Sequence, residues 1–202
     1  VGTLKDAVTA RYGENLYRFF IRVIPECFLS SWNTEKELLQ KKNLPLWDFQ
    51  NPFYIYVGLM LTFLLVAMQI GGIVGVICFI VQAFVAVLHL EVVNYIEHYG
   101  LVRQKLDNGK FEPTRPHHSW NANDHASNLL LINLQKHSDH HARPNKKYQH
   151  LQSYDAGDAP QLPFGYPLMV LMSLIPQFWM KVMNPKVLEW RKRFYPEIQE
   201  WS

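Results

Sequence analysis

The feature that most restricts the fold of this chain is a run of 42 residues, 49–90, that contains no Asp, Glu, Lys or Arg. A single α-helix of that length would measure about 63 Å at ~1.5 Å per residue, roughly twice the ~30 Å hydrocarbon core of a bilayer. The run therefore predicts two membrane crossings, at about 52–70 and 73–95, with a tight reversal at Gly71 and Gly72. A buried pair of helices in a large soluble core is the alternative.

The charged residues all lie in the two flanks of this run. We predict an all-α integral membrane protein with a cytoplasmic or interfacial helical segment at 1–50, a transmembrane helical hairpin at 51–95 and a cytoplasmic, histidine-rich helical region at 96–202. Both flanks carry many Lys and Arg residues, which places them on the cytoplasmic side by the positive-inside rule. The net charge of +3 is too small for a nucleic-acid-binding surface.

Two further segments have helical patterns that suit a membrane surface; for the first of them, ordinary packing against another protein segment is the alternative. Residues 13–43 have apolar side chains at helical spacing, and we expect Pro25 to divide them into two helices, the second capped by Thr34 and Glu37. Residues 164–183 are apolar but contain two prolines, so they favour an interfacial or re-entrant helix over a clean crossing.

Seven of the nine histidines fall between His98 and His141, and the densest group is LQKHSDHH at 134–141. In a helix His137, His140 and His141 are related by steps of three and four residues, so their imidazoles share one face and can converge on a metal ion. By ligand type alone iron, zinc or copper would fit. The alternative is a polar helix face with solvated histidines.

His98 lies directly after the second predicted crossing, in NYIEHYGL. Glu91 and Asn94 fall on the same helical stripe, and a carboxylate near the bilayer is costly unless it is paired. We therefore expect Glu91 to hold the outer nitrogen of a ligand imidazole, with Gly100 ending the helix. The alternative is an interfacial belt of Tyr and His with a solvated Glu.

NYIEHYGL, HSWNAND and LQKHSDHHARP together closely resemble the membrane-bound alkane 1-monooxygenases of the histidine-box superfamily of fatty acid desaturases and hydroxylases. The likeness includes GENLYRFF near the start and LPFGYPLMVLMSLIP near the end. The resemblance implies a non-haem diiron enzyme in the bacterial inner membrane, with its active site on the cytoplasmic side. Such enzymes hydroxylate the terminal methyl of n-alkanes, taken from the bilayer, with O₂ and two electrons from rubredoxin.

The resemblance also assigns roles to residues around the two iron ions. Glu97 and Asp139 would support the ligands from behind, together with Glu91 and Asn94. No catalytic side chain is expected beyond the metal centre, because an unactivated C–H bond needs an oxidant that side chains do not supply. The implied metal ligands are His98, His137, His140 and His141.

The sequence departs from this superfamily in one large respect. Members carry two further boxes, H-E-x-x-H and E-H-x-x-G-H-H, and neither occurs here. Four histidines are too few to hold two irons, so we expect the chain to be the C-terminal part of a longer enzyme, inactive and weak in metal binding by itself. A xylene monooxygenase, a fatty-acyl desaturase and a non-enzymatic membrane metal-binding protein remain alternatives.

Four residues between the two motifs have a less specific pattern. His117, His118, Trp120 and Asn121 are candidates for the mouth of the site or for a surface where the electron donor docks. Solvated loop histidines are the alternative interpretation for the first two.

Overall fold

A computed structural model describes residues 2–3 and 5–198, and within these residues the regular secondary structure is helical, with no β-strand. The chain forms two compact units, one of Val1–Val23 with Glu91–Ser202 and the other of Ile24–Leu90. Helices α1 (Leu16–Lys41) and α2 (Phe53–His98) each contribute residues to both units. The first 23 residues therefore pack with the histidine-rich region. The sequence pattern did not predict this packing.

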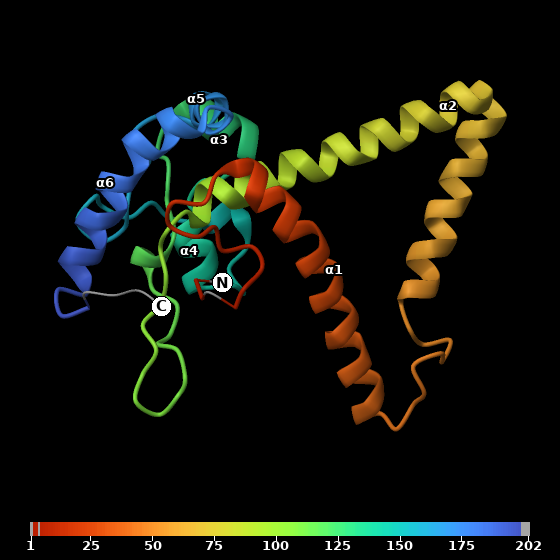
Figure 1. Cartoon of the computed structure of the whole chain (residues 1–202), viewed down its shortest axis with the longest axis horizontal. Helices are drawn as coiled ribbons and strands as arrows, with labels where there is room; N and C mark the ends of the chain where they lie inside the picture. Colours follow the sequence, from red (N-terminus) through yellow and green to blue (C-terminus); the bar gives the residue numbers. More distant parts are fainter. Residues whose placement is uncertain (1, 4, 199–202) are drawn as a thin grey trace. The chain divides into compact units, whose positions relative to one another are not determined.

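The uncharged run forms most of α2, which is long and apolar enough to cross a membrane and whose most apolar stretch is entirely unburied. Gly72 has φ 57° and ψ −148°, which is outside the helical region, and the two arms of α2 meet at this bend (Figure 1). Near the bend the arms approach closely, because a Cβ at Gly75 would lie 2.3 Å from the carbonyl oxygen of Ala67. The bend therefore falls at the predicted glycine pair, while the tight reversal and the two membrane crossings stay predictions.

The prediction that Pro25 divides the N-terminal helix is wrong, because α1 runs through it. A proline inside a helix removes one backbone hydrogen bond, and the remaining bonds of a 26-residue helix maintain its course. The hydroxyl of Thr34 donates to the carbonyl oxygen of Ser30 one turn earlier, so Thr34 lies inside the helix and does not cap a new one.

The unit that contains the histidines is built from short helices around the end of α2. They are α3 (His125–Leu131), α4 (His137–Ala142), α5 (Tyr166–Ser173) and α6 (Pro176–Phe194), with 3-10 turns at Pro116–His118 and Tyr148–His150. Helix α5 packs on both α3 and α6, and α4 packs on the first 3-10 turn.

An aromatic cluster fixes the end of α2 in this unit. The buried indole of Trp179 lies 5.0 Å from the ring of Tyr95 and 5.3 Å from the ring of Tyr99, measured between centroids, and Phe19 adjoins Tyr95 at 5.4 Å. Aromatic pairs at these separations are favourable beyond the area they bury. The last turn of α2 is therefore held on several sides.

Helix α2 ends at His98, and Gly100 follows with φ 69°, as the sequence predicts. The backbone N–H of Gly100 donates to the carbonyl oxygen of Ala10 at 2.9 Å. A Cβ at this position would lie 2.9 Å from both methyl groups of Val187. Both the backbone conformation and the close approach of α6 therefore require glycine here.

Gly100→Ala should lower the free energy of unfolding by roughly 2–4 kcal/mol, because the left-handed conformation and the overpacking against Val187 each cost an alanine about 1–2 kcal/mol or more. Gly109→Ala is the matched control, since Gly109 has φ 78° but no heavy atom lies within 4 Å of the added Cβ. Thermal unfolding in detergent, followed by circular dichroism, measures both. Equal losses in the two variants would contradict the role of the Val187 contact.

Candidate metal centre

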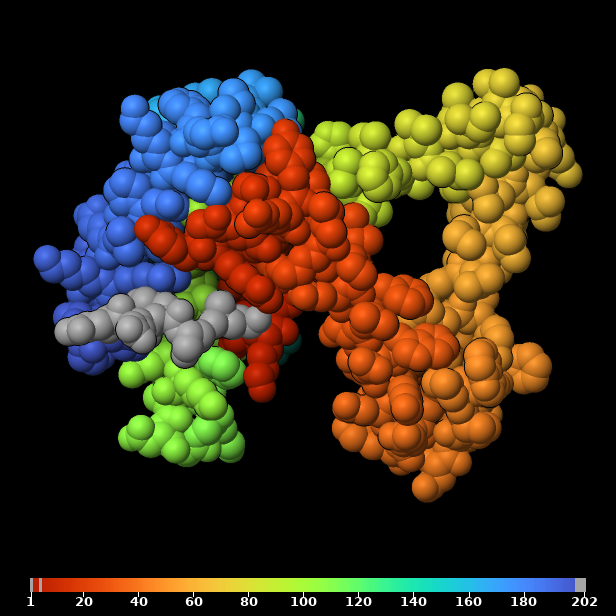
Figure 2. Space-filling view, viewed as in Figure 1, coloured from red at the N-terminus to blue at the C-terminus, as the bar shows by residue number. Residues whose placement is uncertain are grey.

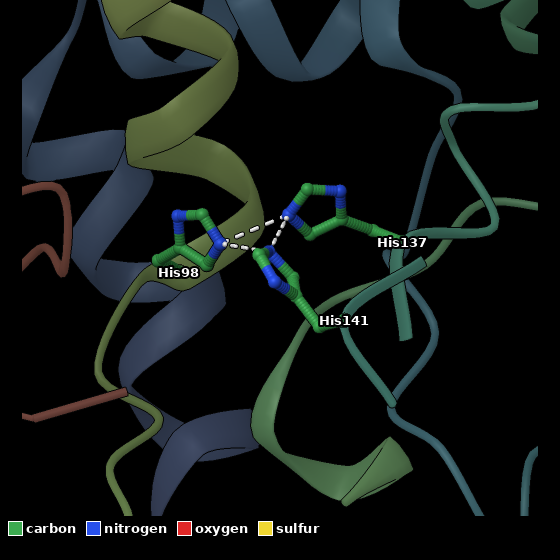
Figure 3. A group of neighbouring side chains, drawn as sticks. All are labelled: His98, His137 and His141. Atoms are coloured by element: carbon green, nitrogen blue, oxygen red, sulfur yellow. Dashed lines mark hydrogen bonds between the residues drawn. The ribbon is translucent and has the colours of Figure 1, made fainter. Parts of the chain in front are cut away.

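Three histidines from two distant parts of the chain converge on one point. His137 and His141 lie one turn apart on α4, and His98 is the last residue of α2. Their Nε2 atoms are separated by 2.9 Å (His98–His137), 3.1 Å (His98–His141) and 2.8 Å (His137–His141). Figure 3 shows the three rings pointing toward one another. The structure therefore brings residues of the two histidine motifs together at one point, and their role as metal ligands stays a prediction.

Hydrogen bonding alone cannot account for this triangle of nitrogens. A neutral imidazole nitrogen either carries a proton and donates or lacks one and accepts. Among three nitrogens at least two must be of the same kind, so at least one of the three contacts opposes like groups. A cation bound by all three lone pairs removes this conflict. Ligand nitrogens at about 2.0–2.1 Å from a metal lie about 2.9–3.4 Å apart, close to the observed edges.

The electrostatic surroundings keep these rings in the form that binds metals. Burial lowers the pKa of His137 well below its usual value, and the neighbouring rings of His98 and His141 lower it further. Burial and the neighbouring His140 lower the pKa of His141 to about 4. Both rings are therefore neutral at pH 7, and a neutral imidazole has the lone pair that a metal requires.

The fourth predicted ligand, His140, does not join the triangle. Its ring centroid lies 5.8 Å from that of His137 and 5.3 Å from that of His141, and the side chain is half-buried. His140 therefore borders the site on α4 without meeting the point on which the other three nitrogens converge.

Glu97 lies closer to the centre than the sequence led us to expect. Its Oε2 atom is 3.1 Å from Nε2 of His137, which is the nitrogen that faces the other two histidines. Its Oε1 atom accepts a hydrogen bond of 2.8 Å from the hydroxyl of Tyr166, and both side chains are buried. The carboxylate thus borders the inner side of the triangle, and Tyr166 of α5 fixes its orientation. Sequence reasoning missed Tyr166, although it lies in the segment LPFGYPLM that carries part of the family resemblance.

The segment of Trp120 and Asn121 joins α2 to α4. The backbone N–H of Trp120 donates to the carbonyl oxygen of Glu97 at 2.9 Å, and its indole N–H donates to that of Tyr99 at 2.9 Å. The side chain of Asn121 accepts from the backbone N–H of Ser138 and donates to the Ser138 hydroxyl. Both side chains are buried, so the exposure that a docking surface needs is absent, and their contacts position the two elements that carry the converging histidines.

Asp139 holds α4 from the side away from the triangle. Its buried carboxylate accepts hydrogen bonds from Nζ of Lys146 at 2.6 Å, from the backbone N–H of Gln152 at 2.9 Å and from the hydroxyl of Tyr154 at 3.1 Å. Although burial raises the pKa of Asp139, these donors together hold the pKa below its usual range. Asp139 therefore supports the histidines by anchoring their helix to the segment 146–154.

Glu91 does not reach the ligand that the sequence suggested for it. Its carboxylate accepts a hydrogen bond from the side-chain amide of Asn94 at 3.2 Å. The two residues thus partner each other on α2, one and two turns before His98, and they give the Glu91 carboxylate the partner that a position near a bilayer requires.

His117 and His118 belong to a second cluster, which is buried, so the interpretation as solvated loop histidines is wrong. With Glu112 they lie close enough to hold a metal ion. However, Nδ1 of His118 accepts the backbone N–H of Arg115 at 2.9 Å, so the neutral ring carries its proton on Nε2 and donates it to the Tyr195 hydroxyl at 2.7 Å. Tyr195 also contacts His117 and donates to Glu112.

In this arrangement the hydroxyl of Tyr195 donates its proton to Glu112 and accepts from Nε2 of His118. Burial lowers the pKa of His118 to about 3, so its ring is neutral and matches this pattern. We interpret the second cluster as a hydrogen-bonded network that ties the segment 112–118 to the end of α6.

A sequence model described as fatty acid desaturase matches residues 1–172, which is most of the chain. The chain belongs to the fatty acid desaturase family. The three converging histidines and the two histidine motifs lie within the matched residues of this family.

Several curated relatives bear a more specific name. The chain is 44% identical to alkane 1-monooxygenase 2 of Pseudomonas aeruginosa, over 93% of this chain and 49% of the relative. It is 42% identical to alkane 1-monooxygenase of Ectopseudomonas oleovorans, over 94% of this chain and 47% of the relative. The hydroxylase component of xylene/toluene monooxygenase of Pseudomonas putida is 29% identical over 94% of this chain and 49% of the relative. The chain thus spans about half the length of the relatives it matches.

Asp139→Asn should lower the free energy of unfolding at neutral pH by roughly 2–4 kcal/mol, because it removes the buried charge that accepts from Lys146. A carboxylate whose folded-state pKa is depressed stabilises the fold above its unfolded-state pKa and loses this effect as the pH falls through the folded-state pKa. The difference between wild type and variant should therefore shrink in acid. Chemical denaturation at a series of pH values measures it.

The exposed Asp155→Asn is the control and should change stability little at any pH. A loss in Asp139→Asn that stays constant down to strongly acidic pH would refute the assigned role of the charge.

Proposed function

We propose that this chain supplies histidine ligands to the two-iron centre of a membrane-bound monooxygenase that hydroxylates the terminal methyl of n-alkanes. The observation that carries the proposal is the triangle of Nε2 atoms of His98, His137 and His141, in a chain whose relatives include several proteins named alkane 1-monooxygenase. Imidazole suits iron, and the set contains no thiolate that would favour a different class of site.

The proposed ligands are His98, His137 and His141, with His140 beside them on α4 for the second ion. The Glu97 carboxylate adjoins the same point and provides an oxygen donor. Two irons require more donors than these side chains offer. Since the chain spans about half the length of its relatives, we infer that the remaining ligands belong to the part of those relatives that this chain does not cover.

The overall reaction converts an alkane, O₂, two electrons and two protons into a primary alcohol and water. When bound, the iron centre supplies the redox chemistry for this step, which amino-acid side chains lack. The protein's own residues hold the ligands in place: Tyr166 orients Glu97, and Asp139 anchors α4. The burial of Glu97, His98 and His137 keeps bulk water from the reacting groups.

The location and the partners follow from the same proposal. The apolar residues 53–90 of α2, which carry no charge, suit a protein of the bacterial inner membrane, from whose bilayer an n-alkane would reach the site without crossing water. The Lys and Arg residues on both sides of α2 favour a cytoplasmic position for the histidines. Rubredoxin is the proposed electron donor.

A second candidate substrate class is supported by the relative named as the hydroxylase component of xylene/toluene monooxygenase. Oxidation of a methyl group on an aromatic ring uses the same kind of centre, and the two reactions differ in the shape of the substrate. The higher identity to the alkane 1-monooxygenases favours the alkane.

Membranes that contain the whole protein, supplied with O₂ and reduced rubredoxin, should convert n-octane to 1-octanol. His137→Ala should reduce this rate by more than about 100-fold, since removing a metal ligand costs more than the ~10–100-fold typical of supporting residues. His125→Ala is the control, because His125 is an exposed histidine at the start of α3. Gas chromatography of the products, with iron analysis of each variant, measures the outcome.

The same membranes are also tested with p-xylene. If they oxidise p-xylene and not n-octane, the substrate class is the aromatic one. Full activity and full iron content in His137→Ala would refute the proposed centre itself.

Tyr166→Phe should weaken iron binding by about 10–100-fold, because it removes the hydroxyl that orients Glu97 and leaves a buried carboxylate oxygen without its donor. Competition with a chelator measures the affinity. Tyr148→Phe serves as the control, since Tyr148 is 52% exposed. An unchanged affinity in Tyr166→Phe would show that Glu97 needs no such support.

A further inference from the structure

A group of large apolar side chains lies at the surface of the unit that contains the histidines. They belong to α3, α5 and the start of α6, which pack on one another in this order. Figure 2 shows the α5 and α6 part (blue) at the surface. The exposed residues of this α3–α5–α6 surface are Leu129, Leu130, Ile132, Leu168, Leu171, Leu174, Ile175 and Phe178.

The surface is free of charge as well as apolar. Residues 126–135 and 159–180 contain no Asp, Glu, Lys or Arg. Soluble proteins rarely leave an extended apolar patch open to water, and such a patch marks contact with a protein or a membrane. Side chains such as Leu130 and Leu171, 64% and 61% exposed, need an apolar environment that the described chain does not supply.

The backbone beneath this surface suits lipid. In a bilayer each N–H and C=O group needs a partner within the protein, and helices provide most of them. The carbonyl oxygen of Leu174, just past the end of α5, accepts the hydroxyl of Tyr17 at 2.9 Å. The end of α5 would otherwise expose this carbonyl to hydrocarbon, and the Tyr17 hydroxyl of α1 gives it a hydrogen-bond donor.

Charge appears directly beyond the apolar residues, and it is mostly positive. Helix α6 carries one acidic residue, Glu189, and five basic residues from Lys181 to Arg193. Lys181, Lys192 and Arg193 are exposed, whereas the guanidinium of Arg191 donates to the carbonyl oxygen of Gly100. Lys and Arg at the edge of an apolar surface extend their charged ends to the phosphates of lipid headgroups. A bilayer changes in the same order, from an apolar hydrocarbon interior to a layer of headgroups that carry phosphates.

We propose that the α3–α5–α6 surface is embedded in the interfacial region of a lipid bilayer, with the exposed basic residues of α6 at the level of the headgroups. This contact is separate from the membrane-crossing role of α2. It does not depend on the iron centre, so a failure of either proposal leaves the other to be judged by its own experiment. The surface would hold the histidine-bearing helices against the membrane from which an apolar substrate comes.

Bimane fluorescence in nanodiscs of phosphatidylcholine tests the proposal. The label is attached to Leu171→Cys or to Leu130→Cys in the chain with Cys27→Ser and Cys78→Ala. Both labels should lose most of their fluorescence when the lipid carries bromine on its acyl chains near the headgroup, and iodide in the water should quench them little. Lys147→Cys is the matched control on an exposed part of the same unit and should show the reverse pattern.

Quenching of the Leu171 and Leu130 labels by iodide and not by brominated lipid would overturn the proposal, because the surface would then face water. Quenching by neither reagent would also overturn it, because a protein segment would then cover the surface. All three positions are exposed in the structure, so the labelled variants should fold, and far-UV circular dichroism checks that they do.

Discussion

Three imidazole nitrogens lie about 3 Å apart in the interior of this protein, and their repulsion must be overcome by the rest of the fold. The protein does so by fixing the two elements that carry them. The end of α2 is held by the aromatic cluster around Trp179 and by the backbone contact from Trp120. Helix α4 is held by Asp139 and Asn121. Bringing three imidazole nitrogens together costs stability, and a cation bound at the proposed centre would restore it.

Helix α4 depends on its surroundings to an unusual degree. It has six residues, far fewer than an isolated helix needs to be stable in water. Its first turn contains three buried polar side chains in succession, His137, Ser138 and Asp139. Ser138 and Asp139 are hydrogen-bonded, and His137 belongs to the triangle of nitrogens. Polar contacts, and not an apolar face, therefore fix this short helix and the two converging histidines that it carries.

The sequence predicts the parts of the structure that depend on local spacing. The one-turn separation of His137 and His141, the end of α2 at Gly100 and the bend at Gly71 and Gly72 each follow from a few adjacent residues. The hydrogen-bonding partners of Glu97 and Asp139 do not follow from local spacing, because Tyr166 and Lys146 reach them only after the chain has folded back. The prediction that Pro25 divides the N-terminal helix is wrong for a related reason. Whether a helix tolerates the loss of one backbone hydrogen bond depends on its whole length. The resemblance to a family located the histidines but gave no information on the network around Tyr195.

The bond between Tyr166 and Glu97 spans 69 positions of the sequence, and it has a consequence for the order of events during synthesis. All three converging histidines are synthesised, and emerge from the ribosome, before Tyr166, and the Lys146 and Tyr154 partners of Asp139 also follow the last histidine. The ligands therefore exist for a time without the residues that orient them. For the proposed metal centre this order means that selective capture of the ion follows the docking of α5, because an ion bound earlier would meet a looser set of donors with less power to discriminate between metals.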